Sequence, residues 1–102
     1  MSYLDDVASE IRGEVPPDLR GEDTEGLFRL YAVLALAKGG AVTARDVHNA
    51  WVAWMQERDP DHKSIRPFTE LDRDTRRADD PFVVAIRRAA ASPSGPRWAS
   101  AD

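Results

Sequence analysis

The stretch DTEGLFRLYAVLALAKGG, residues 23–40, decides the fold because it holds the longest strongly apolar run of the chain. Asp23 and Thr24 suit the start of a helix, since their side-chain oxygens can accept hydrogen bonds from its first backbone N–H groups. The pair Gly39-Gly40 suits its end. A helix this apolar on nearly every side is normally central to a fold. The alternative is that one of its faces covers a second subunit.

Further helices are expected on both sides of this segment. Ser2-Tyr3-Leu4-Asp5 fits a capping box with Asp in the place of Glu, which predicts a first helix over about 3–12. Thr43-Ala-Arg-Asp46 is a similar start for a third helix, which ends before Asp59-Pro60.

The last third of the chain reads as a loop followed by helix. Residues 59–72 form the loop, anchored by the apolar segment 65–71, and a turn or two of helix starts at Asp72. Asp80 then caps a final helix with Pro81 at its first position. Residues 92–102, rich in Pro, Ser, Gly and Ala around Trp98, read as a flexible tail. The sequence therefore predicts a mainly α single domain over 1–91, a bundle of about four helices with an anchored loop.

Composition restricts the expected cellular location and the expected partners of this domain. The chain has 102 residues, no cysteine and a net charge of −4. Its longest apolar run, residues 30–37, is far shorter than the ~20 residues that cross a membrane. The absence of thiols and of a basic, apolar leader favours the cytoplasm. The net negative charge, with eight acids and two bases in residues 1–26, argues against nucleic acid as the main partner.

Motifs for catalysis and metal binding are absent from the sequence. It has no nucleophile elbow, phosphate-binding loop or His-Glu-x-x-His pattern, and His48 and His62 have no metal-ligand spacing. Asp59, Asp61 and Glu70 match three positions of a calcium loop, but Ser64 stands where that loop needs glycine. We therefore expect a binding protein that is not an enzyme and that has no metal or cofactor.

Residues 27–58 also fit a helix-turn-helix, because two helices flank a short turn. The second helix would have to present polar side chains to the bases. Only Arg45, Asn49 and Gln56 are suitable, whereas Trp51 and Trp54 favour burial. DNA binding is kept as a third hypothesis.

The aromatic residues of the third helix offer a different kind of site. Trp51 and Trp54, three residues apart, form a wide ledge with His48 at its edge. Such aromatic residues more often belong to a core than to a pocket. Ligand pockets nevertheless combine apolar walls with a few polar groups, which is the combination found here.

Several of these residues resemble the RyR domain, the repeat named after the ryanodine receptor. The resemblance is carried by VHNAW (47–51), HKSIRPFTEL (62–71) and a helix opened by an Asp. The Gly-Trp-x-Tyr-Gly segment of that family is missing, and Lys63-Ser64 replace its Pro-Cys pair. The chain also resembles small proteins of actinobacteria and their phages.

The RyR resemblance implies a module that binds a nucleotide-derived small molecule or a protein partner. The implied site lies between the third helix and the segment 67–71, where Trp51 packs against Phe68. Trp51 would offer a stacking face, His48 and Glu70 polar contacts, and Arg66 a charge for phosphate.

The runner-up hypothesis is a homodimer formed through the central apolar helix. Leu30, Tyr31 and Leu34 would lie at its interface. In that case the domain would be a helical interaction protein of phage or bacterial origin.

Overall fold

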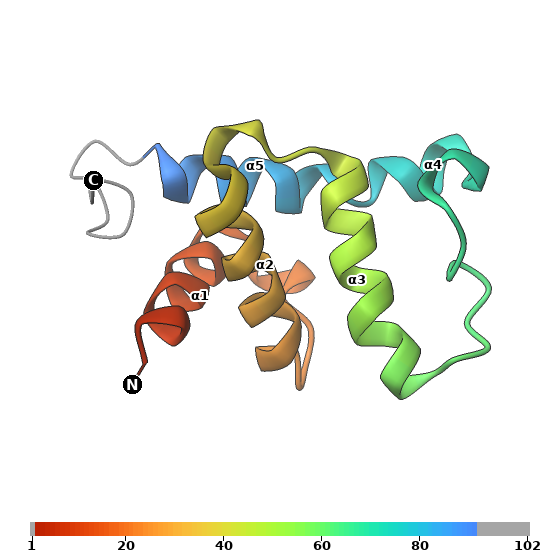
Figure 1. Ribbon diagram of the computed structural model, residues 1–102, viewed down its shortest axis with the longest axis horizontal. Helices are drawn as coiled ribbons and strands as arrows, with labels where there is room; N and C mark the ends of the chain where they lie inside the picture. Colours follow the sequence, from red (N-terminus) through yellow and green to blue (C-terminus); the bar gives the residue numbers. More distant parts are fainter. Residues whose placement is uncertain (1, 92–102) are drawn as a thin grey trace.

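A computed structural model describes residues 2–91, which form five α-helices and three short 3-10 turns (Figure 1). The helices are α1 (Tyr3–Glu14), α2 (Glu25–Lys38), α3 (Ala44–Arg58), α4 (Arg73–Arg77) and α5 (Asp80–Ala90), and the turns are η1 (Pro17–Leu19), η2 (Gly39–Ala41) and η3 (Phe68–Glu70). No strand occurs in the described part of the chain. The predicted mainly α fold is thus confirmed. The predicted tail, with Trp98, lies outside the described residues.

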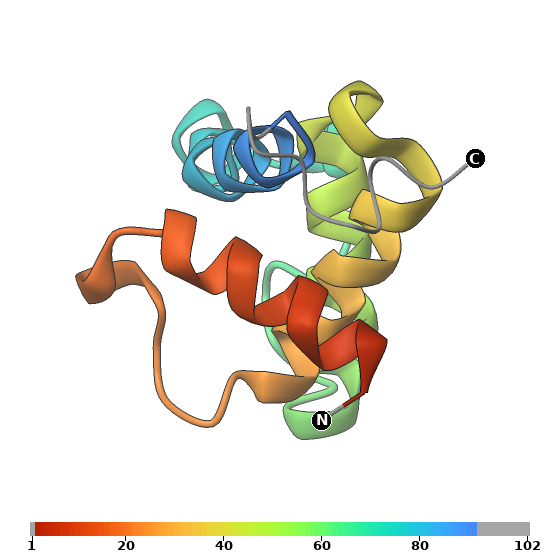
Figure 2. The same ribbon diagram turned by 90° about the vertical axis from the view of Figure 1, so that its left-hand side faces the viewer.

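Helix α2 is the centre of the bundle, as its apolar sequence predicts. It packs against α1, α3 and α5, and α5 lies across the ends of the other helices (Figures 1 and 2). Its buried residues are Leu27, Phe28, Tyr31, Ala32 and Ala35. Its outer face is not covered, because Val33 is 49% exposed and Leu36 is 40% exposed.

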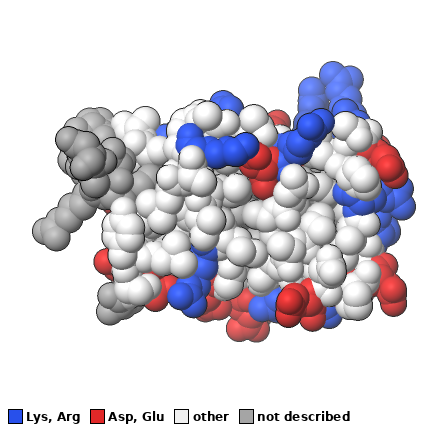
Figure 3. Space-filling model, viewed as in Figure 1, with Lys and Arg blue, Asp and Glu red and all other residues white. Residues whose placement is uncertain are grey.

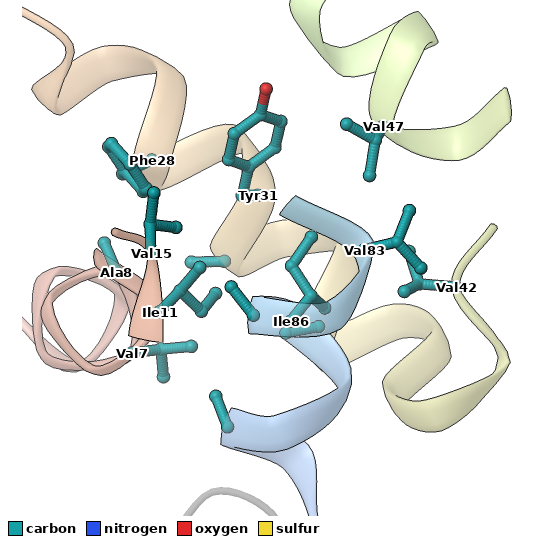
Figure 4. Close-up of a cluster of buried hydrophobic side chains, with 14 of the residues drawn as sticks. Val7, Ala8, Ile11, Val15, Phe28, Tyr31, Val42, Val47, Val83 and Ile86 are labelled. Carbon is teal, nitrogen blue, oxygen red and sulfur yellow. The ribbon is translucent and has the colours of Figure 1, made fainter. Parts of the chain in front are cut away.

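The core is formed mainly by short aliphatic side chains from all four long helices. Its largest fully buried members are Tyr31, Phe28, Ile11, Ile86, Val7, Val15, Val42 and Val47 (Figure 4). The ring of Phe28 meets that of Tyr31 edge-on at 5.7 Å. The hydroxyl of Tyr31 points away from this cluster (Figure 4).

Local capping explains where three of the helices begin. Ser2 Oγ accepts from Asp5 N–H at 3.1 Å at the start of α1. At the start of α3, Asp46 N–H donates to Thr43 Oγ1 and Thr43 N–H donates to Asp46 Oδ2, which completes the predicted capping box. Asp72 Oδ1 accepts from the N–H of Thr75 at 2.8 Å at the start of α4.

Two predicted helix starts are wrong in detail. The residue that precedes α5 is Asp79, not Asp80, and its side chain makes no capping hydrogen bond. Thr24 precedes α2 but does not cap it with its side chain. Its hydroxyl instead donates to the carbonyl of Arg20 at 2.7 Å. The Thr24 hydroxyl is therefore used outside the helix it precedes.

Helix α1 continues two residues beyond its predicted end and stops at Glu14. Val15 follows in an extended conformation, is 1% exposed, and donates its N–H to the carbonyl of Arg12 at 3.1 Å. The connection from Val15 to α2 projects to one side of the bundle (orange in Figure 2). It carries η1, which contributes to the pocket described next.

Candidate functional site

A pocket of about 350 Å³ lies where α2, α3 and the α4–α5 junction meet, beside the connection that carries η1. Its volume falls within the range of small-molecule sites. Its lining comprises Leu19, Arg20, Gly21, Thr24, Leu27, Tyr31, His48, Trp51, Trp54, Ser64, Thr75, Ala78, Asp79 and Phe82. A larger depression, of about 590 Å³, lies between α1 and the end of α5, but no aromatic residue lines it.

Four aromatic side chains from three helices form the walls of this pocket, which we call the aromatic pocket. They are Tyr31 from α2, Trp51 and Trp54 from α3, and Phe82 from α5. The rings of Tyr31 and Phe82 lie 5.5 Å apart. Trp51, Trp54 and Phe82 are only partly buried. These three rings therefore pack against the core and still face open space.

His48 forms the polar base of the α3 wall. Its side chain is 3% exposed, and its ring stacks on Trp51 with centroids 5.8 Å apart. His48 Nε2 lies 2.7 Å from the carbonyl oxygen of Arg66. Because a carbonyl can only accept, Nε2 carries the proton of this bond. The bond fixes the ring and attaches the 59–72 loop to α3.

Asp79 contributes a buried side-chain oxygen without a partner to this site. Its Oδ2 atom is buried and has no hydrogen-bond partner among the described residues. Burial raises the pKa of Asp79 to about 6; His48 acts in the opposite direction, and Asp80 adds to the rise. Burial, with a smaller contribution from Asp79, also raises the pKa of Tyr31. Tyr31 therefore stays neutral, while Asp79 titrates just below neutral pH.

The connection around η1 is held in place by hydrogen bonds. Arg12 Nη1 donates to Thr24 Oγ1, and Arg20 Nε donates to the carbonyl of Val15 at 3.0 Å. Arg58 Nη2 donates to the carbonyl of Asp23, while its guanidinium lies 4.2 Å from the centre of the Trp54 ring. These contacts fix this side of the aromatic pocket relative to α1 and α3.

The structure separates the five residues predicted to bind a ligand. His48 and Trp51 line the aromatic pocket. Arg66 and Glu70 are exposed and line a shallow depression beside Lys63 and Asp72, which we call the loop depression. Phe68 lies in neither, because η3 turns its ring beneath Arg76, whose guanidinium is 5.4 Å from the ring centre. The predicted ligand set therefore does not line a single cavity.

The expected packing of Trp51 against Phe68 involves a third ring. Each of the two rings packs against the imidazole of His48, at 5.8 Å and 6.1 Å respectively. Trp51 also meets His62 edge-on at 5.0 Å. The 59–72 loop is thus attached to α3 through His48 and His62.

The residues predicted for a dimer interface differ in exposure. Leu30 and Leu34 are half-buried on α2, whereas Tyr31 is 1% exposed. Tyr31 is unavailable to a second subunit because it faces Phe28 and Phe82 inside the fold. Its assignment to the interface is wrong.

Sequence reasoning missed Asp79, Phe82 and the η1 side of the pocket. The sequence does hold a signal for Asp79, in the pair Asp79-Asp80 before Pro81. Only one of two adjacent acids can occupy the position before a helix, so the other is available for a different role. The ledge predicted from Trp51 and Trp54 does line the pocket.

Fold and site together define a small helical domain with an aromatic pocket that contains a half-buried carboxylate. Residues 2–91 match a family described as Domain of unknown function (DUF7701), and the chain belongs to that family. No curated protein and no solved structure matches the chain. Within residues 2–91, no helix is long and apolar enough to cross a membrane, and no group of three or more acidic or histidine side chains is arranged to hold a metal ion.

Proposed function

We propose that this domain is a non-catalytic binding module and that its ligand occupies the aromatic pocket. The observation that carries the proposal is the unpartnered Asp79 Oδ2 within a wall of four aromatic rings. Leaving a buried acceptor unpaired lowers stability, so a ligand that donates to it gains a strong contact. The RyR resemblance implies the same kind of module and contributes His48 and Trp51 to this pocket.

Binding is favoured over catalysis by the state of the polar groups. His48 Nε2 is already bonded to the carbonyl of Arg66, which holds the ring in one orientation. The hydroxyl residues in the pocket lining are Thr24, Tyr31, Ser64 and Thr75, and the hydroxyl of Thr24 already donates to the carbonyl of Arg20. No hydroxyl is hydrogen-bonded to His48 in the described chain, as a nucleophile with its general base would be.

The test is a thermal-shift screen in which nucleotides and nucleosides are the first probe class. A ligand that binds only the folded state raises the melting temperature, by an amount that grows with the logarithm of its concentration above the Kd. The shift should disappear in Trp51→Phe and in Asp79→Asn, both of which alter the aromatic pocket. It should persist in the double variant Arg66→Gln/Glu70→Gln, which alters only the loop depression. A shift lost in the double variant alone would move the site to that depression.

A dimer formed through the outer face of α2 is the second candidate. Val33 and Leu36 are exposed there beside the half-buried Leu30 and Leu34. Much of the face that carries α2 and α3 is free of charge, and charged side chains gather toward its edges (Figure 3). Sedimentation equilibrium of the wild type and of Leu36→Lys tests this candidate. A mass that rises with concentration only in the wild type supports it.

DNA binding through α3 is the third candidate. Arg45, Asn49 and Gln56 are all exposed on this helix, and η2 supplies the turn between α2 and α3. Retention on DNA that weakens steeply with salt would support it. Absence of retention at low salt would remove it. The proposed location for every one of these roles is the cytoplasm, on the basis of the cysteine-free composition.

A further inference from the structure

We infer that the ligand of the aromatic pocket is an organic cation, a small molecule or side chain that carries an alkylated ammonium group. The inference rests on the proposed function, because it names the ligand class of the same pocket. It is drawn from the arrangement of one carboxylate and four aromatic rings. The carboxylate favours a positive charge on the ligand, and the rings favour alkyl groups around that charge.

The first property of the ligand, its positive charge, is inferred from the placement of Asp79. An aspartate directly before a helix ordinarily accepts a hydrogen bond from an N–H of the first turn. The side chain of Asp79 makes no such bond, although α5 begins at the next residue. One of its oxygens is instead buried at the pocket and lacks a partner in the described chain. A positively charged ligand would provide the missing partner.

The second property of the ligand, its alkyl groups, is inferred from the aromatic walls of the pocket. Trp51, Trp54, Tyr31 and Phe82 all line the same pocket as Asp79. The face of an aromatic ring attracts cations, and tryptophan does so most strongly. Alkyl groups on a nitrogen also bury apolar surface against these rings, which a bare ammonium cannot do. A cluster of aromatic rings beside a carboxylate therefore selects an alkylated cation over a simple one.

The other charged groups around the pocket limit where the cation can lie. The guanidinium of Arg58 lies 4.2 Å from the centre of the Trp54 ring, so that face of Trp54 already holds a cation. The lining contains one fixed positive charge, Arg20, which comes from the η1 side and donates through Nε to the carbonyl of Val15. The cationic part of the ligand would therefore lie at the Asp79 side. An anionic ligand would face the carboxylate of Asp79 directly. A volume of about 350 Å³ accepts a trimethylammonium compound with space to spare.

Acidity should weaken the binding of a cation. Burial raises the pKa of Asp79 to about 6, so acid neutralises the carboxylate as the pH falls through that value. His48, which lines the same pocket, donates through Nε2 to the carbonyl of Arg66. The remaining groups that face the pocket or adjoin Asp79 are Tyr31, Arg20 and Asp80. Tyr31 stays neutral there because burial raises its pKa, and Asp80 is exposed.

A pair of probes with the same shape and different charge tests the inference. Choline and its neutral carbon analogue 3,3-dimethyl-1-butanol differ in one atom and one charge. Binding is followed by tryptophan fluorescence in a Trp98→Phe background, where Trp51 and Trp54 are the remaining reporters. We expect saturable binding of choline at neutral pH, at least about tenfold tighter than the analogue. Tetramethylammonium and trimethyllysine complete the panel of cations.

Two aspartate variants separate the pocket from general electrostatics. Asp79→Asn should reduce the preference for choline over the analogue to about twofold or less, because the charge of the partner is gone. Asp80→Asn removes the neighbouring exposed carboxylate and should leave the preference unchanged. Circular dichroism of both variants checks that they are folded. Equal loss in the two variants overturns the inference.

The remaining outcomes distinguish the two proposals. Equal affinity for choline and its analogue overturns the cation inference and supports a ligand in the pocket. If a nucleotide shifts the melting temperature and no cation of the panel binds at about 50 mM, the cation inference is overturned and a ligand in the pocket is still supported. Failure of every probe class to bind, in a protein that is folded, overturns both proposals.

Discussion

Two regions on opposite sides of Tyr31 are built from different side chains. Toward α1 and α5, the short aliphatic residues Val7, Ile11 and Ile86 are completely buried. Toward α3, large aromatic side chains are only partly covered, and they surround His48 and Asp79. Short aliphatic side chains interdigitate and fill space, whereas rigid rings from three helices leave an opening between them. The first region holds the fold together, and the second is available for recognition.

The largest expected effect tests the aliphatic region. Ile86→Ala removes a side chain that is fully buried between α5 and its neighbours, and leaves a cavity that the packed core cannot close. We expect the free energy of unfolding to fall by about 2–5 kcal/mol. Urea denaturation followed by circular dichroism measures the change. A loss well below 1 kcal/mol would show that this region is not closely packed and would remove the contrast.

The next effect concerns the attachment of the 59–72 loop to the pocket. His48→Phe keeps a ring beside Trp51 but leaves the carbonyl of Arg66 without its donor. Loss of a buried hydrogen-bond partner costs about 1–3 kcal/mol. Hydrogen exchange should become faster in the loop and remain unchanged in α1. Asn49→Ala, at an exposed position of the same helix, is the control because the bond from His48 to the carbonyl of Arg66 is retained, and equal exchange in the two variants would contradict this role of His48.

A smaller effect, opposite in sign, is expected at Asp79. Its pKa of about 6 in the folded protein is higher than the ordinary value of an unfolded aspartate. The folded state therefore binds the proton more tightly, so stability rises as the pH falls from about 7 to about 5. Because the carboxyl group is only half-buried, the gain is roughly 1–2 kcal/mol at most. Asp79→Asn should be more stable than the wild type at neutral pH by a similar amount and should lose this part of the pH dependence.

The control for Asp79 is the adjacent Asp80, which is exposed. Asp80→Asn should retain most of the pH dependence of the wild type when both are melted across the same series of buffers, because burial is the largest cause of the raised pKa of Asp79 and Asp80 a smaller one. Stability of Asp79→Asn below that of the wild type at neutral pH would mean that the carboxylate has a stabilising partner. The contrast between an aliphatic core and an unsatisfied pocket would then be lost.

The sequence predicts the elements of this fold better than it predicts the pocket. Helix α2 and the caps at Thr43 and Asp72 were predictable because they depend on residues within four positions of each other. The bond from His48 to the carbonyl of Arg66 uses a backbone acceptor, which any residue type could supply. The order of residue types in the sequence therefore does not indicate that hydrogen bond.

The placement of the 66–70 segment shows the same limit. Phe68 and Glu70 are two residues apart in η3. The tight turn directs the ring of Phe68 inward and the side chain of Glu70 to solvent. Sequence spacing alone treats both as parts of one site. The direction of each side chain depends on the path of the loop, which is set by Arg76 donating to the carbonyls of Phe68 and Thr69.

The smallest effect on folding is expected at the outer face of α2, where the apolar side chains contribute little to either region. Leu36 is 40% exposed, so Leu36→Lys should change the free energy of unfolding by less than about 0.5 kcal/mol. Lysine also keeps a high helix propensity, which removes a separate cause of instability. Chemical denaturation at two protein concentrations measures the change. A large loss that grows with concentration would mean that a second copy covers this face, since dissociation would then be coupled to unfolding. In that case the outer face of α2 would also be buried. A subunit interface, together with the aromatic pocket, would then account for the apolar sequence of this helix.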